Sequence, residues 1–295
     1  MVFQSIVLGG KCRDKVRVYN HTAGRTEEEL IENAIKGKEE GFTALGHLNP
    51  YLDEPRNQPF HDNNTQMLYN AERRIARVRE AVGEDTDLCL ELHRRLEPGL
   101  AVQLSARLEP YAPMFLEDPI RPDNFDEMAR VAQQCQIPIA TGERINSLFE
   151  FEMLLERGAC SYVRASIGVC GGFTGIKKIA ALAEAHHKSL VPHNPLSPVT
   201  TNALLQFCAA TDNIAICEYP DPYAASTADH LTGSGSKLRQ VDMVTQIPKF
   251  EKGYVEIPEG PGLGIDLISD VEERFPFRPH AVGTRLNLDG SICDQ

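Results

Sequence analysis

The chain has 295 residues, of which 42% are hydrophobic and 24% charged, a composition typical of a folded globular protein. Its net charge of −12 argues against general nucleic-acid binding, which needs a basic face, and no apolar run approaches the roughly 20 residues of a membrane span. The start of the chain lacks a signal-peptide pattern. The eight cysteines form no C-x-x-C pair, so we expect reduced core residues in a cytoplasmic protein.

Short β-rich runs alternate with helical patterns along most of the chain. The steps between successive strand ends are 26, 44, 26, 26, 23, 27 and 25 residues, nearly constant except for one. The long step contains the loop NPYLDEPRNQPFHDNNTQ, and loops of this length are usually lids or disordered insertions. In chain order, the expected strands end near His21, His47, Glu91, Glu117, Glu143, Ser166, His193 and Glu218.

Amphipathic helices are expected between these strands. The stretch TEEELIENAIKGKEEG offers Thr26 as an N-cap, acidic residues in its first turn and Gly41 at its C-terminus. Apolar residues at i, i+3, i+4 and i+7 also predict helices in FDEMARVAQQC, LFEFEMLLERG and GIKKIAALAEAHH.

Eight strand–helix units predict an α/β fold, a (β/α)8 TIM-type barrel whose active site lies at the C-terminal ends of the strands. A doubly wound open sheet is the competing architecture. It is less favoured because the first turn lacks G-x-G-x-x-G and because eight units close a barrel. We expect a lead-in segment over residues 1–14, the barrel over 15–225, and a C-terminal segment over 226–295 that packs beside it.

Three of the expected strands end on glutamates spaced 26 residues apart, Glu91, Glu117 and Glu143. Adjacent barrel strands would bring these carboxylates to one mouth, where three hard oxygen ligands suit Mg²⁺. A lone glutamate at a strand end is more often solvated or salt-bridged. The regular spacing of three of them favours a shared metal.

The other strand ends carry groups for proton chemistry. His93 follows Glu91 by two residues, so strand alternation would put both side chains on one face. A metal beside His93 and His193 could stabilise an enediolate formed by removing a proton α to a carboxylate. Taken alone, His193 could equally be structural. Arg144 and Arg164 could pair with a carboxylate of the site or of the substrate, and ordinary salt bridges are about as probable.

Several motifs in order resemble the enolase superfamily, specifically its acid-sugar dehydratases related to galactonate and mannonate dehydratases. These motifs are LELHRR, FLEDP, ATGER, GVCGGFTGIKKIAALAEAHH, VPHNPLSP and GPGLGID. The resemblance covers almost the whole chain and implies Mg²⁺-dependent dehydration of an aldonic sugar acid to a 2-keto-3-deoxy acid. It also implies a homo-oligomer. A catalytically inactive barrel that binds metal or sugar acid and an acid racemase are the alternatives.

The resemblance also implies residue roles. Glu91, Glu117 and Glu143 would bind Mg²⁺, and His93 would be the acid that assists departure of the 3-hydroxyl. His193 would be the base, and Glu218 would hydrogen-bond the substrate carboxylate. The expected substrate-binding residues are Arg144, Arg164, His47 and Tyr51.

The chain departs from the family pattern at several positions. The first metal ligand is usually Asp and here is Glu91, and the second strand usually carries a lysine where this chain has His47. Ser166 replaces the Asp that normally orients the base, which should weaken His193. Mannonate dehydratases take their base from the loop after strand two, where the candidates are Tyr51, Arg56 and His61. The N-terminal capping domain of the family is also expected to be absent, because the chain begins just before the first strand.

Overall fold

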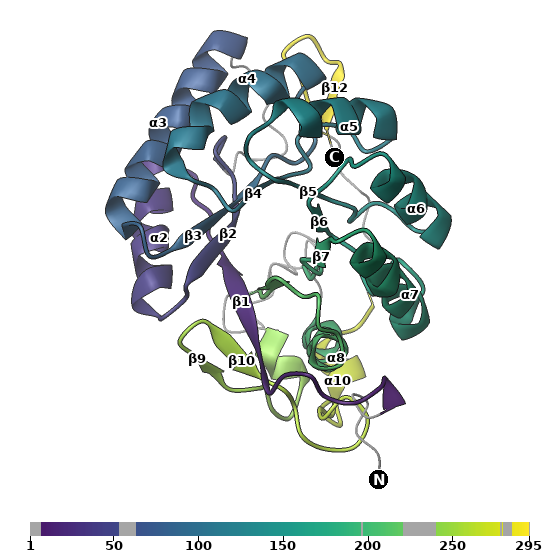
Figure 1. Ribbon diagram of the computed structural model, residues 1–295. Helices are drawn as coiled ribbons and strands as arrows, with labels where there is room; N and C mark the ends of the chain where they lie inside the picture. The colour runs from purple at the N-terminus through teal and green to yellow at the C-terminus, as the bar shows by residue number, and fades with distance from the viewer. Residues whose placement is uncertain are drawn as a thin grey trace.

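The computed structural model describes residues 7–52, 63–195, 197–220, 240–277, 279 and 285–294. Figure 1 looks along a ring of strands that has helices on its outside. The strands of the ring are β1 (Lys15–His21), β2 (Ala44–Leu48), β3 (Asp87–Glu91), β4 (Phe115–Glu117), β5 (Ile139–Thr141), β6 (Tyr162–Val163), β7 (Ser189–Leu190) and β8 (Cys217–Glu218). The helices are α2 (Glu27–Glu39), α3 (Asn64–Val82), α4 (Pro98–Leu108), α5 (Phe125–Gln134), α6 (Leu148–Glu156), α7 (Gly172–Ala185) and α8 (Pro198–Ala209).

The sheet order confirms the TIM-type barrel. Strands β1 to β7 pair in parallel with their chain neighbours, and β8 pairs in parallel with β1. In the described part of the chain, β7 and β8 form no ladder. A single bridge between Leu190 and Ile214 joins β7 to the segment just before β8 instead, so the ring is not closed by a continuous ladder.

Local sequence signals set the helix boundaries. Helix α2 begins after Thr26, whose side chain accepts a hydrogen bond from the Glu29 amide. Gly41 follows the helix end with a φ of +97°, a conformation that glycine adopts without a Cβ clash. Helix α6 begins with a capping box between Ser147 and Glu150. The other two predicted helices are also present, as α5 and α7.

Strand alternation divides the core into two apolar clusters. Side chains on the outer face of the ring pack against the helices in a large cluster. The inner face holds a smaller cluster that takes residues from most of the strands or their immediate flanks. Its buried members are Tyr19, Ala44, Cys89, Phe115, Ala140, Val191 and Ile216.

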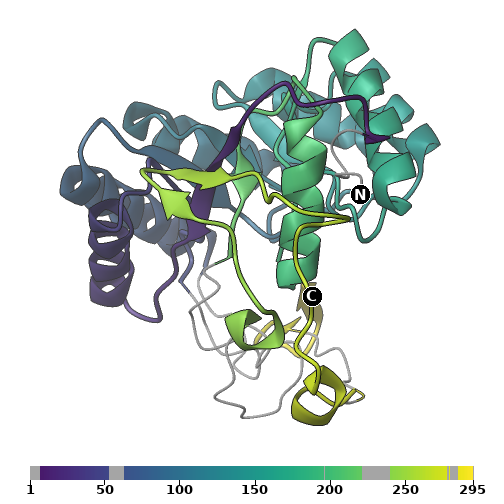
Figure 2. The same ribbon diagram turned by 90° about the horizontal axis from the view of Figure 1, so that it is seen from below.

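The C-terminal segment packs against the first strand of the barrel. Strands β9 (Phe250–Glu251) and β10 (Tyr254–Glu256) form a hairpin, and β10 pairs antiparallel with the start of β1 (Figure 2). Helix α10 (Val271–Arg274) and a separate pair of strands, β11 (Arg285–Leu286) and β12 (Ile292–Asp294), follow. The described residues also contain two short 3-10 helices, η1 (Glu109–Tyr111) and η2 (Gln240–Met243). The predicted boundary at 225/226 lies outside the described residues. No described helix is long and apolar enough to cross a bilayer.

Gly46 on β2 faces the inside of the ring, where a Cβ would lie 2.0 Å from Cδ2 of Tyr19. The Tyr19 side chain is 1% exposed and its phenol ring packs edge-on against Phe115, so it has little room to move. We expect Gly46→Ala to lower the free energy of unfolding by about 1–3 kcal/mol, the usual cost of overpacking. Gly99→Ala, where a Cβ meets nothing within 4 Å, is the matched control and should not destabilise. Urea unfolding measures both variants, and equal stabilities would contradict the steric argument.

Candidate active site

Polar side chains lie directly beyond the inner apolar cluster, at the C-terminal ends of the strands. Two-residue alternation places Glu91 beyond Cys89 and Glu117 beyond Phe115 on the inner face. Both glutamates are 1% exposed. The barrel therefore has an apolar floor under a layer of ionisable groups.

Glu143 reaches this layer by a different route. Strand β5 ends at Thr141, and Gly142 has a φ of +133° that only glycine adopts readily. The chain turns there and brings Glu143 beside the other two carboxylates. One oxygen from each of Glu91, Glu117 and Glu143 lies within 4.8 Å of the others. The structure thus brings the three predicted metal ligands together.

Each of these carboxylates accepts at least one hydrogen bond from the protein. Oε1 of Glu91 accepts from the His93 amide at 2.6 Å, and Oε1 of Glu117 accepts from Nε of Arg164 at 2.5 Å. Oε1 of Glu143 accepts from Arg94 at 2.6 Å. Among the described residues, no donor reaches Oε2 of Glu91 or of Glu117. These hard oxygens fit a divalent cation such as Mg²⁺, which prefers carboxylate and water ligands.

Arg164 bridges two of the buried carboxylates. Its guanidinium lies 2.5 Å from Glu117 and 2.8 Å from Oε2 of Glu218, and all three side chains are at most 2% exposed. Oε2 of Glu218 also accepts a hydrogen bond from the Asn194 backbone amide at 2.7 Å. The other oxygen of Glu218, Oε1, lies 2.7 Å from Nε2 of His21. Arg164 therefore pairs with carboxylates of the site, one of the alternatives that the sequence left open.

A second buried arginine, Arg94, was not among the site residues predicted from the sequence. Its Nη1 lies 3.1 Å from Asp118 and 2.6 Å from Glu143, and Asp118 also accepts from the Thr141 hydroxyl at 2.5 Å. His21 and Asn194 were missed as well. The motifs LELHRR and FLEDP contain Arg94 and Asp118, but no pattern in the sequence reveals that they pair.

The ionisation of the carboxylates reflects burial and the two arginines. Burial and the neighbouring Glu117 and Glu143 raise the pKa of Glu91 well above its usual value. Burial raises the pKa of Glu117 to about 7, against the opposing charge of Arg164. Burial opposes ionisation of Glu143 and Glu218 too, but His193 and the arginines lower the pKa of both well below the usual value. Added positive charge would stabilise the ionised forms of Glu91 and Glu117.

His93 lies beside Glu91, but for a different reason from the one expected. Strand β3 ends at Glu91, and His93 has a φ of +53°, so the chain has turned and strand alternation no longer applies. Its imidazole meets the ring of His47 edge-on, with centroids 5.2 Å apart. Burial, aided by nearby positive charge, lowers the pKa of His93 well below its usual value and that of His47 to about 4.

His193 lies beside the third carboxylate, with Nε2 3.0 Å from Oε2 of Glu143. Burial would lower the pKa of His193, but Glu218 and Glu143 raise it overall. Ser166 and His193 form an isolated bridge just beyond the ends of β6 and β7. The buried Ser166 Oγ and His193 Nδ1 nevertheless have no hydrogen-bond partner in the described part of the protein. No described side chain or backbone group therefore orients the His193 ring by a hydrogen bond at Nδ1.

The remaining candidates lie at the edge of the site or outside it. Nε of Arg144 lies 3.4 Å from Glu143, with the side chain 45% exposed at the mouth. Tyr51 is buried in the outer core cluster, with the Arg95 guanidinium 5.5 Å from its ring centroid. Arg56 and His61 fall outside the described residues.

The sequence of this chain matches a known protein family. The model of the family described as "Enolase C-terminal domain-like" matches residues 55–271. The chain belongs to the enolase superfamily. The predicted family resemblance is thereby confirmed.

Relatives in this superfamily include named dehydratases. D-galactonate dehydratase of Ralstonia pickettii is 33% identical over 263 residues, covering 88% of this chain and 65% of that protein. D-mannonate dehydratase of Caulobacter vibrioides is 30% identical over 306 residues, covering 97% and 72%. A crystal structure of an enolase from Agrobacterium radiobacter, with bound Na and L-malate, superposes with a TM-score of 0.86. It is 27% identical and matches 100% of this chain and 74% of its own. The chain thus spans about two thirds to three quarters of these relatives.

The Arg164 bridge predicts a large stability effect. Replacing this side chain by methionine leaves Glu117 and Glu218 buried without their main counter-charge, which we expect to cost about 3–5 kcal/mol of unfolding free energy. The matched control is Arg121→Met, because Arg121 is 68% exposed and approaches Glu97 only to 3.9 Å. Urea denaturation compares the two, and a loss below about 1 kcal/mol for Arg164→Met would contradict the bridge.

Proposed function

We propose that this protein dehydrates an aldonic sugar acid to a 2-keto-3-deoxy acid, using a divalent cation, Mg²⁺, bound by Glu91, Glu117 and Glu143. The observation that carries the proposal is the convergence of these three carboxylates between two imidazoles, His93 beside Glu91 and His193 beside Glu143. The names of the galactonate and mannonate dehydratases among its relatives support this reaction class.

The charge of the site supports a cation and an anionic substrate. Among the described residues, Arg94 and Arg164 are the buried arginines that pair with Glu117 and Glu143, and they also pair with Asp118 and Glu218. Bound Mg²⁺ supplies positive charge that binds the substrate carboxylate and lowers the pKa of its α-carbon proton. The half-exposed Arg144 at the mouth is placed to attract the same carboxylate.

The two imidazoles supply the base and the acid. His193 takes the α-proton, and for this it must be neutral. The negative charge of Glu143 and Glu218 raises the pKa of His193, so a cation beside Glu143 would lower that pKa and favour the neutral imidazole. His93 protonates the departing 3-hydroxyl. Its pKa is lowered in the free protein, and the carboxylate of an entering sugar acid raises it again by adding negative charge to the mouth.

Glu218 and His47 complete the proposed substrate contacts. Glu218 is held by Arg164, His21 and the Asn194 amide, so its carboxylate is fixed in position. The lowered pKa of Glu218 keeps it ionised, so in the proposed arrangement it acts on the substrate carboxylate through His21, whose Nε2 lies 2.7 Å from its Oε1. His47 faces the same mouth from β2.

A panel of aldonic acids incubated with the full chain and Mg²⁺ tests the reaction. We expect 2-keto-3-deoxy products with at least one acid, and loss of product when a chelator removes the cation. His93→Ala should lower kcat by about 10²–10⁴-fold, the usual contribution of a general acid. His186→Ala, at the C-terminal end of α7 and outside the site, is the control that should keep activity. A silent panel with metal still bound would instead support a barrel that only binds metal or sugar acid.

Exchange of the substrate α-proton in D₂O separates the two histidines. If His193 is the base, His193→Ala loses both exchange and dehydration, whereas His93→Ala keeps exchange and loses only dehydration. Mass spectrometry of recovered substrate measures the exchange. The reverse pattern would overturn the assignment of the two roles, and exchange in the parent protein without any dehydrated product would identify a racemase.

A further inference from the structure

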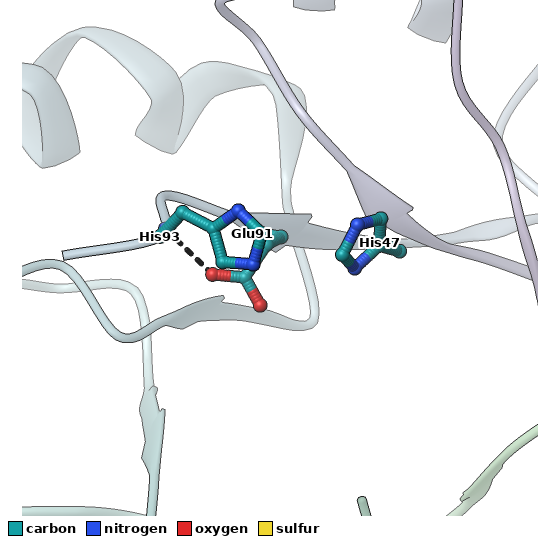
Figure 3. A group of neighbouring side chains, drawn as sticks. All are labelled: His47, Glu91 and His93. Carbon is teal, nitrogen blue, oxygen red and sulfur yellow. Dashed lines mark hydrogen bonds between the residues drawn. The ribbon is translucent and has the colours of Figure 1, made fainter. Parts of the chain in front are cut away.

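A second set of potential metal ligands overlaps the carboxylate group. Ligand atoms of His47, Glu91 and His93 all lie within 4.8 Å of one another. Figure 3 shows the two imidazoles and the Glu91 carboxylate at the C-terminal ends of β2 and β3. The set contains two nitrogens and one carboxylate, a different chemistry from the three carboxylates of the proposed Mg²⁺ site.

The backbone positions both imidazoles by unusual local geometry. The pairing of β2 with β3 shifts between Leu45 and Leu48, so β2 contains an extra residue opposite β3. His47 lies in this bulge with a φ of +47°, and His93 has a φ of +53°. Such values are uncommon outside glycine, and bulges beside active sites often redirect a side chain. Here they bring rings from two strands onto the same carboxylate.

Among the described residues, no hydrogen bond or ion pair involves a ring nitrogen of His47 or His93. His21 and His193 each have a ring nitrogen within 3.0 Å of a carboxylate. In the described part of the chain, the aromatic contacts of the His47 and His93 rings are with imidazoles: His47 stacks on His21 at 4.9 Å and meets His93 edge-on at 5.2 Å. Both residues are partly exposed, which leaves an ion a route to them.

The negative charge around the site is large enough to attract a second cation. The carboxylates of Glu91, Glu117, Glu143, Asp118 and Glu218 face two buried guanidiniums, those of Arg94 and Arg164. If all five carboxylates ionise, one divalent ion leaves the cluster negatively charged. A second divalent ion turns its charge positive, as suits a mouth that receives an anion.

We propose that His47, Glu91 and His93 form a binding site for a transition-metal dication of the Zn²⁺ class, separate from the hard-cation site and sharing Glu91 with it. Imidazole ligands favour Zn²⁺, Co²⁺ and Ni²⁺ over Mg²⁺, and two histidines with one glutamate are a known zinc ligand set that leaves a position for water. Tetrahedral zinc holds its ligand atoms roughly 3.3 Å apart, so binding draws the two rings inward.

The geometry at the ends of β2 and β3 supports this zinc site, and that support does not depend on the proposed reaction. If dehydration does occur, a zinc ion bound to His93 withdraws that imidazole from proton transfer, and zinc then inhibits. That consequence alone rests on the proposed function. Binding itself is measured without substrate.

Zn²⁺ titration of the metal-free full chain in excess Mg²⁺ tests the site by calorimetry, with Co²⁺ absorption as a report of nitrogen ligation. We expect one Zn²⁺ per chain beside Mg²⁺. His47→Ala should weaken Zn²⁺ binding by at least about 100-fold. Removing a residue that only hydrogen-bonds a metal ligand costs up to about 100-fold in affinity, and removing a ligand itself should cost at least as much. His93→Ala should do the same, and His186→Ala should not.

Glu117→Gln separates this site from the hard-cation site, because Glu117 belongs only to the latter. It should weaken Mn²⁺ binding and leave Zn²⁺ binding intact, whereas His47→Ala should do the opposite. Circular dichroism confirms that each variant is folded. The proposal is overturned if Mg²⁺-loaded protein takes up no Zn²⁺, or if Zn²⁺ affinity falls in Glu117→Gln and not in His47→Ala. Loss of dehydratase activity alone bears only on the proposed function.

Discussion

The contact of Arg164 with Glu117 and Glu218 is the interaction on which the rest of the site depends. Burying a carboxylate is costly unless a cation or hydrogen bonds compensate, and this guanidinium serves two of them inside the barrel. It also donates to the Val191 carbonyl at 3.1 Å, which ties the ends of β4, β7 and β8 together. The orientation of Glu117 toward the other carboxylates follows from this anchor.

The site combines residues that follow the strand repeat with residues that break it. Glu91 and Glu117 face inward because alternation from the apolar floor puts them there. Glu143 and His47 arrive through local exceptions, the turn at Gly142 and the bulge in β2. A regular barrel would place neither side chain at this depth. Backbone irregularity of this kind commonly marks functional sites.

Strand ends and helix caps were predictable because their causes are local. Thr26 as an N-cap predicts the start of α2, and apolar periodicity predicts α6, although its Ser147 cap was not predicted. The 26-residue spacing locates three carboxylates at the ends of adjacent strands. The pairing of Arg94 with Asp118 and Glu143 was not predictable, since it joins residues up to 49 positions apart through a turn. The proximity of His93 to Glu91 was predicted correctly, but from strand alternation, which was the wrong reason.

The central claim is that Glu91, Glu117 and Glu143 hold a divalent cation. Crystals of the full chain grown with Mn²⁺, measured at the manganese absorption edge, test it most directly. The account predicts one anomalous peak within about 2.0–2.4 Å of an oxygen from each of these three carboxylates. A fully soaked crystal with no peak there, or with its peak bound to other residues, would contradict it.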